Sequence, residues 1–200
     1  MDAVILAAGV SRRMGRQKML LPFGKGTALS TVIDSVRRAR FERIVVVTSP
    51  SLAESSPSLF EGVELVVNSN PERGQAASLR LGLENLGPDE NHFCLLLGDM
   101  PLVSPAVMDE LRQRFLDRPL GKTSLVPFRE GRFGHPSFYE PLWKVRLKEA
   151  QGDSGGRETI RRYWEEVLGD PGFDVCFMDM DTPEDYRDLL EKSKAREESA

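Results

Sequence analysis

Short, uniformly apolar runs alternate along the chain with segments whose apolar residues recur every three or four positions. The uniform runs are typical of strands buried on both faces of a parallel sheet, and they predict strands at residues 3–6, 44–47, 63–67, 93–97 and 175–178. The helical spacing predicts helices at residues 28–40, 75–86, 141–149 and 158–167, with two more that begin at Pro105 and Pro183. Strands that alternate with helices favour an α/β fold with a mostly parallel sheet.

Two stretches interrupt this alternation. Glu130-Gly131 lies between the apolar segments 124–128 and 132–138 and predicts a hairpin that adds a small antiparallel insertion to the sheet. Residues 49–58 are rich in Ser and Pro and predict a loop with one helical turn. Since the sequence has no internal repeat or linker, we expect one domain over residues 1–190 and a polar tail at 191–200.

Composition narrows the class of protein. The chain has 200 residues, of which 40% are hydrophobic, enough for the core of one globular domain. A net charge of -4 argues against a general nucleic-acid binder, which needs a broad basic face. Cys94 and Cys176 lie in apolar runs and are expected to be buried thiols, and the spacing of Cys and His does not predict a zinc site. Because the sequence has neither a leader pattern nor a stretch of transmembrane length, we expect a cytoplasmic protein without a membrane partner.

The segment VILAAGVSRRMGRQKMLLP, residues 4–22, holds the most specific signal for chemistry. It contains Arg12, Arg13, Arg16 and Lys18, and no acidic residue occurs between Asp2 and Asp34. A loop with glycines and uncompensated cations at the end of a buried strand is suited to a polyphosphate. Neither G-x-x-x-x-G-K-[ST] nor G-x-G-x-x-G fits the segment. The alternative interpretation is a solvated basic turn between a strand and a helix.

Carboxylates near strand ends supply candidates for a metal site. Asp99 follows the predicted strand at 93–97, where open α/β sheets place ligands, and a carboxylate there suits Mg²⁺. A turn Asp ahead of Pro101 is the competing interpretation. Asp179 and Asp181 precede a helix start of the capping-box kind, which does not itself require them. They are candidates for a second metal carboxylate.

Weaker candidates follow from spacing alone. Gln75 and Ser78 are one helical turn apart and could share a face towards a base or ribose, or face solvent. His135, in FGHPSF, is isolated, and an isolated His commonly satisfies a local backbone group. Asp153 and Arg157 belong to GDSGGR, which by itself is a glycine-rich turn.

These blocks together resemble a known family, in chain order. LAAGVSRRMGRQKMLLP is similar to the signature L-A-[AG]-G-x-S-x-R-M-G-x-x-K of nucleotidyltransferases related to molybdopterin guanylyltransferase. GQAASLRLGL, LLLGDMPLVSP, FGHPSF, GDSGGR and MDTPEDY resemble motifs of molybdenum cofactor cytidylyltransferases. The blocks extend from Leu6 to Tyr186, so the resemblance covers nearly the whole chain.

The resemblance implies a Rossmann-like three-layer fold and transfer of CMP from CTP to the terminal phosphate of molybdenum cofactor, with Mg²⁺ or Mn²⁺. By position, Arg13 and Lys18 would bind the triphosphate, and Asp99 and Asp181 the metal, with Asp179 in reserve. Catalysis would rest on Arg13, Lys18 and Asp99. The nucleotide would contact Leu6, Ala7, Ala8, Gly9, Ser11, Arg13, Lys18, Asn68, Gln75 and Ser78.

The second substrate would face His135, Asp153 and Arg157, and a molybdenum hydroxylase would receive the product. Ala8 favours CTP, because L-A-A-G resembles cytidylyltransferases and L-A-G-G guanylyltransferases. Three alternatives stay open: another nucleotide such as GTP, a sugar or alcohol phosphate as acceptor, and a maturation chaperone that binds the cofactor without catalysis.

Overall fold

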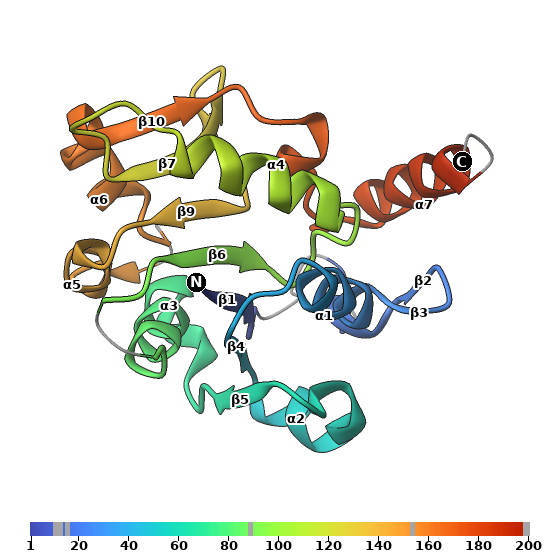
Figure 1. Cartoon of the computed structure of the whole chain (residues 1–200). Coiled ribbons are helices and arrows are strands. Elements are labelled where there is room, and N and C mark those ends of the chain that lie inside the picture. The colour runs from blue at the N-terminus through green and yellow to red at the C-terminus, as the bar shows by residue number, and fades with distance from the viewer. Residues whose placement is uncertain (10–13, 15–16, 88–89, 153–154, 198–200) are drawn as a thin grey trace.

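The computed structural model describes residues 1–9, 14, 17–87, 90–152 and 155–197. The strands of its main sheet are β1 (Asp2–Ala7), β4 (Ile44–Thr48), β5 (Glu64–Val67), β6 (Phe93–Leu97), β7 (Ser124–Arg129), β8 (Arg132–Phe133), β9 (Ser137–Tyr139) and β10 (Val167–Asp170). They are ordered β10-β7-β9-β6-β1-β4-β5, and β8 pairs with β7 (Figure 1). A second, two-stranded antiparallel sheet is formed by β2 (Pro22–Phe23) and β3 (Gly26–Thr27).

The parallel half of the sheet is built around β1. This strand pairs in parallel with β6 on one side and β4 on the other, so that Ala3 lies opposite both Cys94 and Ile44. All six residues of β1 are buried. The prediction of a central strand at this position is confirmed, and the loop that follows it leaves the sheet at the carboxyl ends of neighbouring parallel strands.

Helices cover both faces of the sheet in three layers. Ala3, Ile5 and Ala7 of β1 pack with side chains of α1 (Ala28–Arg38) and α4 (Pro105–Leu116). Val4 and Leu6 point the other way and share a core with α3 (Gln75–Glu84), α5 (Leu142–Lys148) and α6 (Arg157–Arg162). Since successive side chains of a strand alternate between faces, one apolar strand supplies both cores. The predicted three-layer α/β fold is confirmed.

The last helix, α7 (Pro183–Glu197), ties the two ends of the chain together. Leu189 belongs to a third apolar cluster with Met14 and Phe23. The hydroxyl of Tyr186 donates a 2.7 Å hydrogen bond to the carbonyl of Pro22. The helix extends away from the sheet in Figure 1 and includes most of the segment predicted as a polar tail. The C-terminal helix therefore lies against Met14 and β2.

Two secondary-structure predictions near the C-terminus are wrong. Residues 174–177 form a 3-10 helix, Asp174–Phe177, and not a strand, because Val175 and Cys176 face different apolar clusters over one short turn. A short apolar run alone does not distinguish a buried strand from a buried helical turn. The strand of this region is β10, which is parallel to β7. Its first residue, Val167, lies in the segment predicted as a helix, and the observed helix already ends at Arg162.

The antiparallel insertion contributes more strands to the main sheet than the sequence suggests. The turn at Glu130-Gly131 joins β7 and β8 as a hairpin, as predicted. The chain then returns as β9, which lies between β6 and β7 and is antiparallel to both. The insertion is therefore part of the main sheet.

Residues 49–58 are also more helical than expected, with α2 (Pro50–Ser55) and a 3-10 helix that begins at Pro57.

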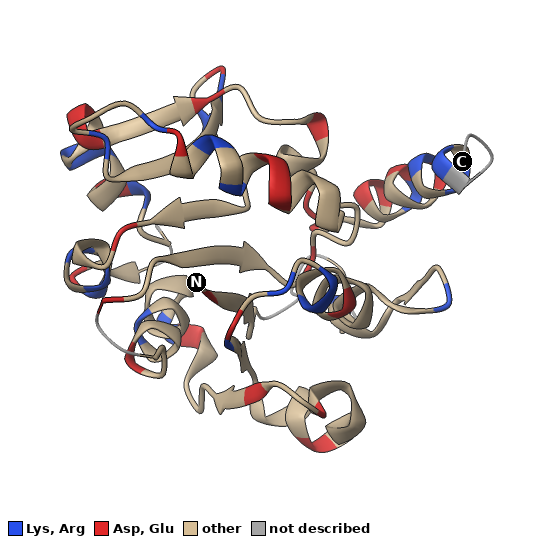
Figure 2. Ribbon diagram, viewed as in Figure 1, with Lys and Arg blue, Asp and Glu red and all other residues tan. Residues whose placement is uncertain are grey.

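The two cysteines lie where their apolar surroundings in the sequence predict. Cys94 and Cys176 are buried free thiols. Acidic and basic residues are interspersed along the same elements, including α7 (Figure 2). No helix among the described residues is long and apolar enough to cross a membrane.

Candidate active site

The ammonium group of Lys18 lies between two carboxylates. Its Nζ donates a hydrogen bond of 2.5 Å to Oδ2 of Asp99 and one of 2.8 Å to Oδ1 of Asp181. The side chains of Lys18 and Asp99 are each 9% exposed, and that of Asp181 is 30% exposed. The structure thus brings together the lysine predicted to bind a triphosphate and both aspartates predicted to bind a metal.

Local structure holds the two aspartates in place. Asp99 lies two residues after the last residue of β6, at the carboxyl end of a parallel strand. Asp181 directly precedes the capping box of α7, in which the Thr182 hydroxyl accepts a hydrogen bond from the Asp185 amide and the Asp185 carboxylate accepts one from the Thr182 amide. The amide of Met180 donates to the carbonyl of Asp99 at 3.1 Å. A backbone bond therefore aligns the two carboxylate-bearing segments.

The charges around Asp99 favour an additional cation. Burial raises the pKa of Asp99, Lys18 opposes that change, and the nearby Asp179 and Asp181 add to it. Burial disfavours the charged form of Lys18, but Asp99 and Asp181 outweigh this and raise the pKa of its ammonium group. Oδ1 of Asp99 is buried and has no hydrogen-bond partner within the part of the chain that the structure describes. A buried carboxylate oxygen without a partner is suited to a hard metal ion.

Asp99 and Asp181 form an open two-carboxylate site and not a site that is closed by protein ligands alone. Among the described residues, no group of three or more His, Cys, Asp or Glu side chains is arranged to hold a metal ion. Mg²⁺ commonly takes one or two carboxylates and completes its shell with water and substrate phosphates. Asp99 and Asp181 match that requirement.

The structure separates the two late aspartates that the sequence left as alternatives. Asp181 contacts Lys18 directly. Asp179 instead lines a neighbouring pocket together with Met100, while remaining close enough to Asp99 to raise its pKa. The two carboxylates therefore face different parts of the site.

The end of β1 and the end of β6 approach each other closely. The amide of Gly98 donates a 2.9 Å hydrogen bond to the carbonyl of Leu6, and a Cβ on Gly98 would lie 2.9 Å from the Cβ of Ala7. Ala8 is buried in the core under α3, and no described residue lies within 4 Å of the Cβ position of Gly9. Ala7 and Gly9 thus lie where the loop leaves the sheet, whereas the side chains of Leu6 and Ala8 are core residues.

Several predicted site residues cannot be placed. Ser11, Arg13 and Asp153 lie outside the described residues, as do Arg12 and Arg16. Their assignments stay predictions.

Two residues predicted to contact the nucleotide bind each other. Nδ2 of Asn68, just after β5, donates a 2.9 Å hydrogen bond to Oγ of Ser78 in α3, and both side chains are buried. Oδ1 of Asn68 accepts a hydrogen bond from the amide of Asn70. The Asn68 amide is therefore used to position Ser78 and the turn after β5.

Gln75 is linked to the glycine-rich turn GDSGGR. The Cβ position of Gly155 is filled by the side-chain amide of Gln75, and Gly155 has φ +57°. Only glycine meets both conditions without displacing Gln75. The turn that precedes α6 therefore lies against the first residue of α3, a contact that spacing along the sequence did not indicate.

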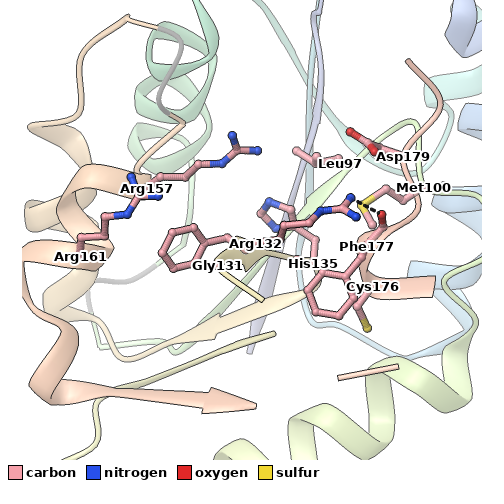
Figure 3. Close-up of a pocket in the computed structure, with 12 residues that line it drawn as sticks. Leu97, Met100, Gly131, Arg132, His135, Arg157, Arg161, Cys176, Phe177 and Asp179 are labelled. Carbon is pink, nitrogen blue, oxygen red and sulfur yellow. Dashed lines mark hydrogen bonds between the residues drawn. The ribbon is translucent and has the colours of Figure 1, made fainter. Parts of the chain in front are cut away.

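A pocket of about 190 Å³ lies beside the aspartates (Figure 3). Two predicted acceptor-side residues, His135 and Arg157, both line it, as do Arg132, Arg161 and Asp179. No sequence motif indicated Arg132 or Arg161 as site residues. The spacing of Arg157 and Arg161, four positions apart in α6, was the available signal, since such residues share one helix face.

His135 is a neutral side chain near pH 7. Its Nδ1 lies 3.2 Å from the carbonyl oxygen of Leu95, and its backbone amide donates to the carbonyl of Cys176 at 2.9 Å. Burial lowers the pKa of His135 to about 4; the hydrogen bond to Leu95 opposes this change, and the charge of Arg157 contributes to it. The expectation that an isolated His satisfies a backbone group thus accounts for Nδ1, which is one of its two ring nitrogens.

The comparison with known families agrees with this arrangement. The family model described as "MobA-like NTP transferase domain" matches residues 3–167. The chain belongs to this family of nucleotidyltransferases. It is 26% identical over 191 residues to the molybdenum cofactor cytidylyltransferase of Escherichia coli, covering 92% of this chain and 93% of the relative. It is 28% identical over 154 residues to a probable molybdenum cofactor guanylyltransferase of Methanosarcina mazei, covering 74% of this chain and 64% of that one.

Solved structures show the same fold. The crystal structure of Rv0371c from Mycobacterium tuberculosis superimposes with a TM-score of 0.81 at 31% identity, covering 95% of this chain and 96% of that one. A second structure of Rv0371c is described as a complex with manganese; its TM-score is 0.75, at 27% identity and a coverage of 95% and 97%. The predicted family is confirmed.

Proposed function

We propose that this MobA-like nucleotidyltransferase moves CMP from CTP to the terminal phosphate of molybdenum cofactor and releases pyrophosphate. The observation that carries the proposal is the position of Lys18 between Asp99 and Asp181. One buried cation and two carboxylates at the end of β6 are the groups needed to bind a triphosphate together with a divalent ion. A Mg²⁺ or Mn²⁺ ion held by Asp99 and Asp181 would neutralise charge on the phosphates.

The reaction is a substitution at the α-phosphorus of CTP. A phosphate oxygen of the acceptor forms a bond to that phosphorus, while the bond to the bridging oxygen of the β-phosphate breaks and pyrophosphate leaves with the electron pair. The attacking phosphate is already anionic, so no side chain has to remove a proton. Positioning and neutralisation of charge are what the protein supplies.

Lys18 has two successive partners in this proposal. Without substrate it neutralises Asp99 and Asp181, as the hydrogen bonds of 2.5 and 2.8 Å describe. With the nucleotide and a divalent ion bound, Asp99 and Asp181 would hold the ion, and Lys18 would bind the phosphate oxygens that become pyrophosphate. Arg13 is proposed to bind the same group.

CTP and molybdenum cofactor are the substrates best supported by similarity. The cytidylyltransferase of Escherichia coli is related over 92% of this chain, and Ala8 belongs to the L-A-A-G form of the first motif. The relation to a probable guanylyltransferase supports GTP as the second candidate nucleotide. A molybdenum hydroxylase is the proposed recipient of the product.

The test measures pyrophosphate release by the purified full-length protein with Mg²⁺ or Mn²⁺. Each of CTP, GTP, ATP and UTP is offered with molybdenum cofactor, and CTP is offered with sugar and alcohol phosphates. We expect release only with CTP and molybdenum cofactor. Release with GTP alone would overturn the nucleotide assignment, and release with a sugar or alcohol phosphate would overturn the acceptor. Binding of the cofactor without pyrophosphate from any nucleotide would indicate a chaperone.

A further inference from the structure

The pocket beside the aspartates combines three cations with one neutral hydrogen-bond acceptor. We call the set Arg132, His135, Arg157 and Arg161 the arginine pocket. In Figure 3, Arg157 and Arg161 lie on the side of α6, Asp179 lies on the opposite side, and the ring of His135 lies between them. The pocket therefore differs in chemistry from one side to the other.

None of the three arginines is neutralised within the described part of the chain. Arg132 donates a 3.0 Å hydrogen bond to the carbonyl of Phe177, and the guanidinium of Arg161 lies over the ring of Phe133 at 5.2 Å. Neither contact involves a carboxylate, and Arg157 has no ion pair among the described residues. By contrast, Arg162 of the same helix pairs with Glu149. Cations that converge on a pocket and form no ion pair there favour an anionic or oxygen-rich ligand.

The ring of His135 offers a lone pair to this pocket. A carbonyl oxygen only accepts hydrogen bonds, so Nδ1, which faces the Leu95 carbonyl, carries the proton. In the neutral ring the other nitrogen, Nε2, is then an acceptor. It suits a ligand with an N–H group at this position and disfavours one with a carbonyl or carboxylate there, because two acceptors repel.

We propose that the arginine pocket is the acceptor subsite, in which Arg157 and Arg161 bind an anionic or oxo group of the acceptor while Nε2 of His135 accepts a hydrogen bond from an N–H group. This inference rests on the proposed function, since it assigns the second substrate of the same site. The acceptor then carries its reacting phosphate at the Asp99 side and a second anionic or oxygen-rich end at the α6 side. A heterocycle with ring N–H groups between two anionic ends matches this pattern.

The test uses pterin-6-carboxylate, a fluorescent molecule with ring N–H groups and one anionic group, as the binding probe. Its Kd is measured for the full-length protein and for a variant with Arg157→Gln and Arg161→Gln. Losing charge-assisted hydrogen bonds should raise the Kd by about 10- to 100-fold. Arg162→Gln, on the same helix but paired with Glu149, should change the Kd by less than about twofold. Equal Kd values for the double variant and the parent, or no binding by the parent, would overturn the inference.

His135 is tested with two substitutions. His135→Phe keeps a ring but has no acceptor, and it should weaken binding of the probe. His135→Gln keeps an acceptor and should recover part of that binding. Equal binding by both variants and the parent would contradict the role of Nε2. The Kd of CTP should stay the same in every variant, and a loss of CTP binding would assign the pocket to the nucleotide instead.

The results distinguish failure of the subsite from failure of the proposed function. Probe binding that depends on Arg157 and Arg161, without pyrophosphate release from any nucleotide, would reject the catalytic proposal and retain the subsite. Pyrophosphate release whose KM for molybdenum cofactor is unaffected by the double variant would retain the catalysis and reject the subsite.

Discussion

Nζ of Lys18 lies 2.8 Å from a carboxylate oxygen of Asp181, although 163 positions separate the two residues. The contact exists because α7 packs against Met14 and β2, through Leu189 and the hydrogen bond from Tyr186 to Pro22. The first and the last motif of the chain therefore form one site. Substitutions in either motif are therefore expected to affect the same site.

Replacing Lys18 by Met should lower kcat/KM for the nucleotide by roughly 100- to 1,000-fold, because one positive group on the leaving pyrophosphate is lost. Steady-state pyrophosphate release measures this change. Lys25→Met is the matched control, since Lys25 lies exposed in the turn between β2 and β3 and should leave kcat/KM unchanged. Equal activity of the Lys18 variant and the parent would show that the lysine only neutralises the aspartates.

Metal binding should distinguish Asp181 from Asp179. Asp99→Asn and Asp181→Asn should each raise the Kd of Mn²⁺ by at least about tenfold, since each removes a charged oxygen ligand, and Asp179→Asn should have a smaller effect. Electron paramagnetic resonance of free Mn²⁺ measures the Kd directly, without turnover. A larger effect of Asp179→Asn than of Asp181→Asn would reverse the assignment of the second ligand.

Gly155→Ala should change the preference between CTP and GTP while the fold is kept. A methyl group there meets the side-chain amide of Gln75, which is flexible enough to move away and would lose its position near the nucleotide. The measurement is the ratio of kcat/KM for the two nucleotides. Gly152→Ala is a matched control, because Gly152 has a similar φ of +62° and no described residue lies within 4 Å of its Cβ position. An equal shift in both variants would assign the effect to backbone strain.

Stability should fall on acidification partly through His135. Folding lowers the pKa of His135 to about 4, below its value in the unfolded chain, so the unfolded state binds more protons between these two pH values. Stability is therefore lost as the pH falls from about 6.5 towards 4, by about 2 kcal/mol between pH 7 and pH 5.

Urea unfolding of the parent and of His135→Gln at both pH values measures this contribution as a difference of differences. His92→Gln is the companion variant, because burial also lowers the pKa of His92. Parallel loss of stability in the parent and His135→Gln would show that His135 does not resist protonation.

Elements with unambiguous local signals were predictable from the sequence. Residues 3–8 are all apolar, and such a run identifies a strand with two buried faces. Ser104 and Pro105 mark a helix start chemically, and the Ser104 side chain accepts a hydrogen bond from the Val107 amide. The run at 175–178 is as apolar as a buried strand, but residues 174–177 form a 3-10 helix, since the geometry depends on neighbours that are distant in sequence.

The site divides in the same way. The sequence by itself indicated the family and the three-layer fold, and it supplied Lys18, Asp99 and either Asp179 or Asp181 as candidates, because each of these residues stands within a short motif whose chemistry is local. Only the tertiary structure decided that Lys18 bridges the two aspartates, that Asn68 binds Ser78, that Gln75 lies against Gly155, and that Arg132 and Arg161 join His135 in one pocket. These contacts join segments from different strands and helices, and their geometry depends on how the layers pack, which no local pattern of residues specifies.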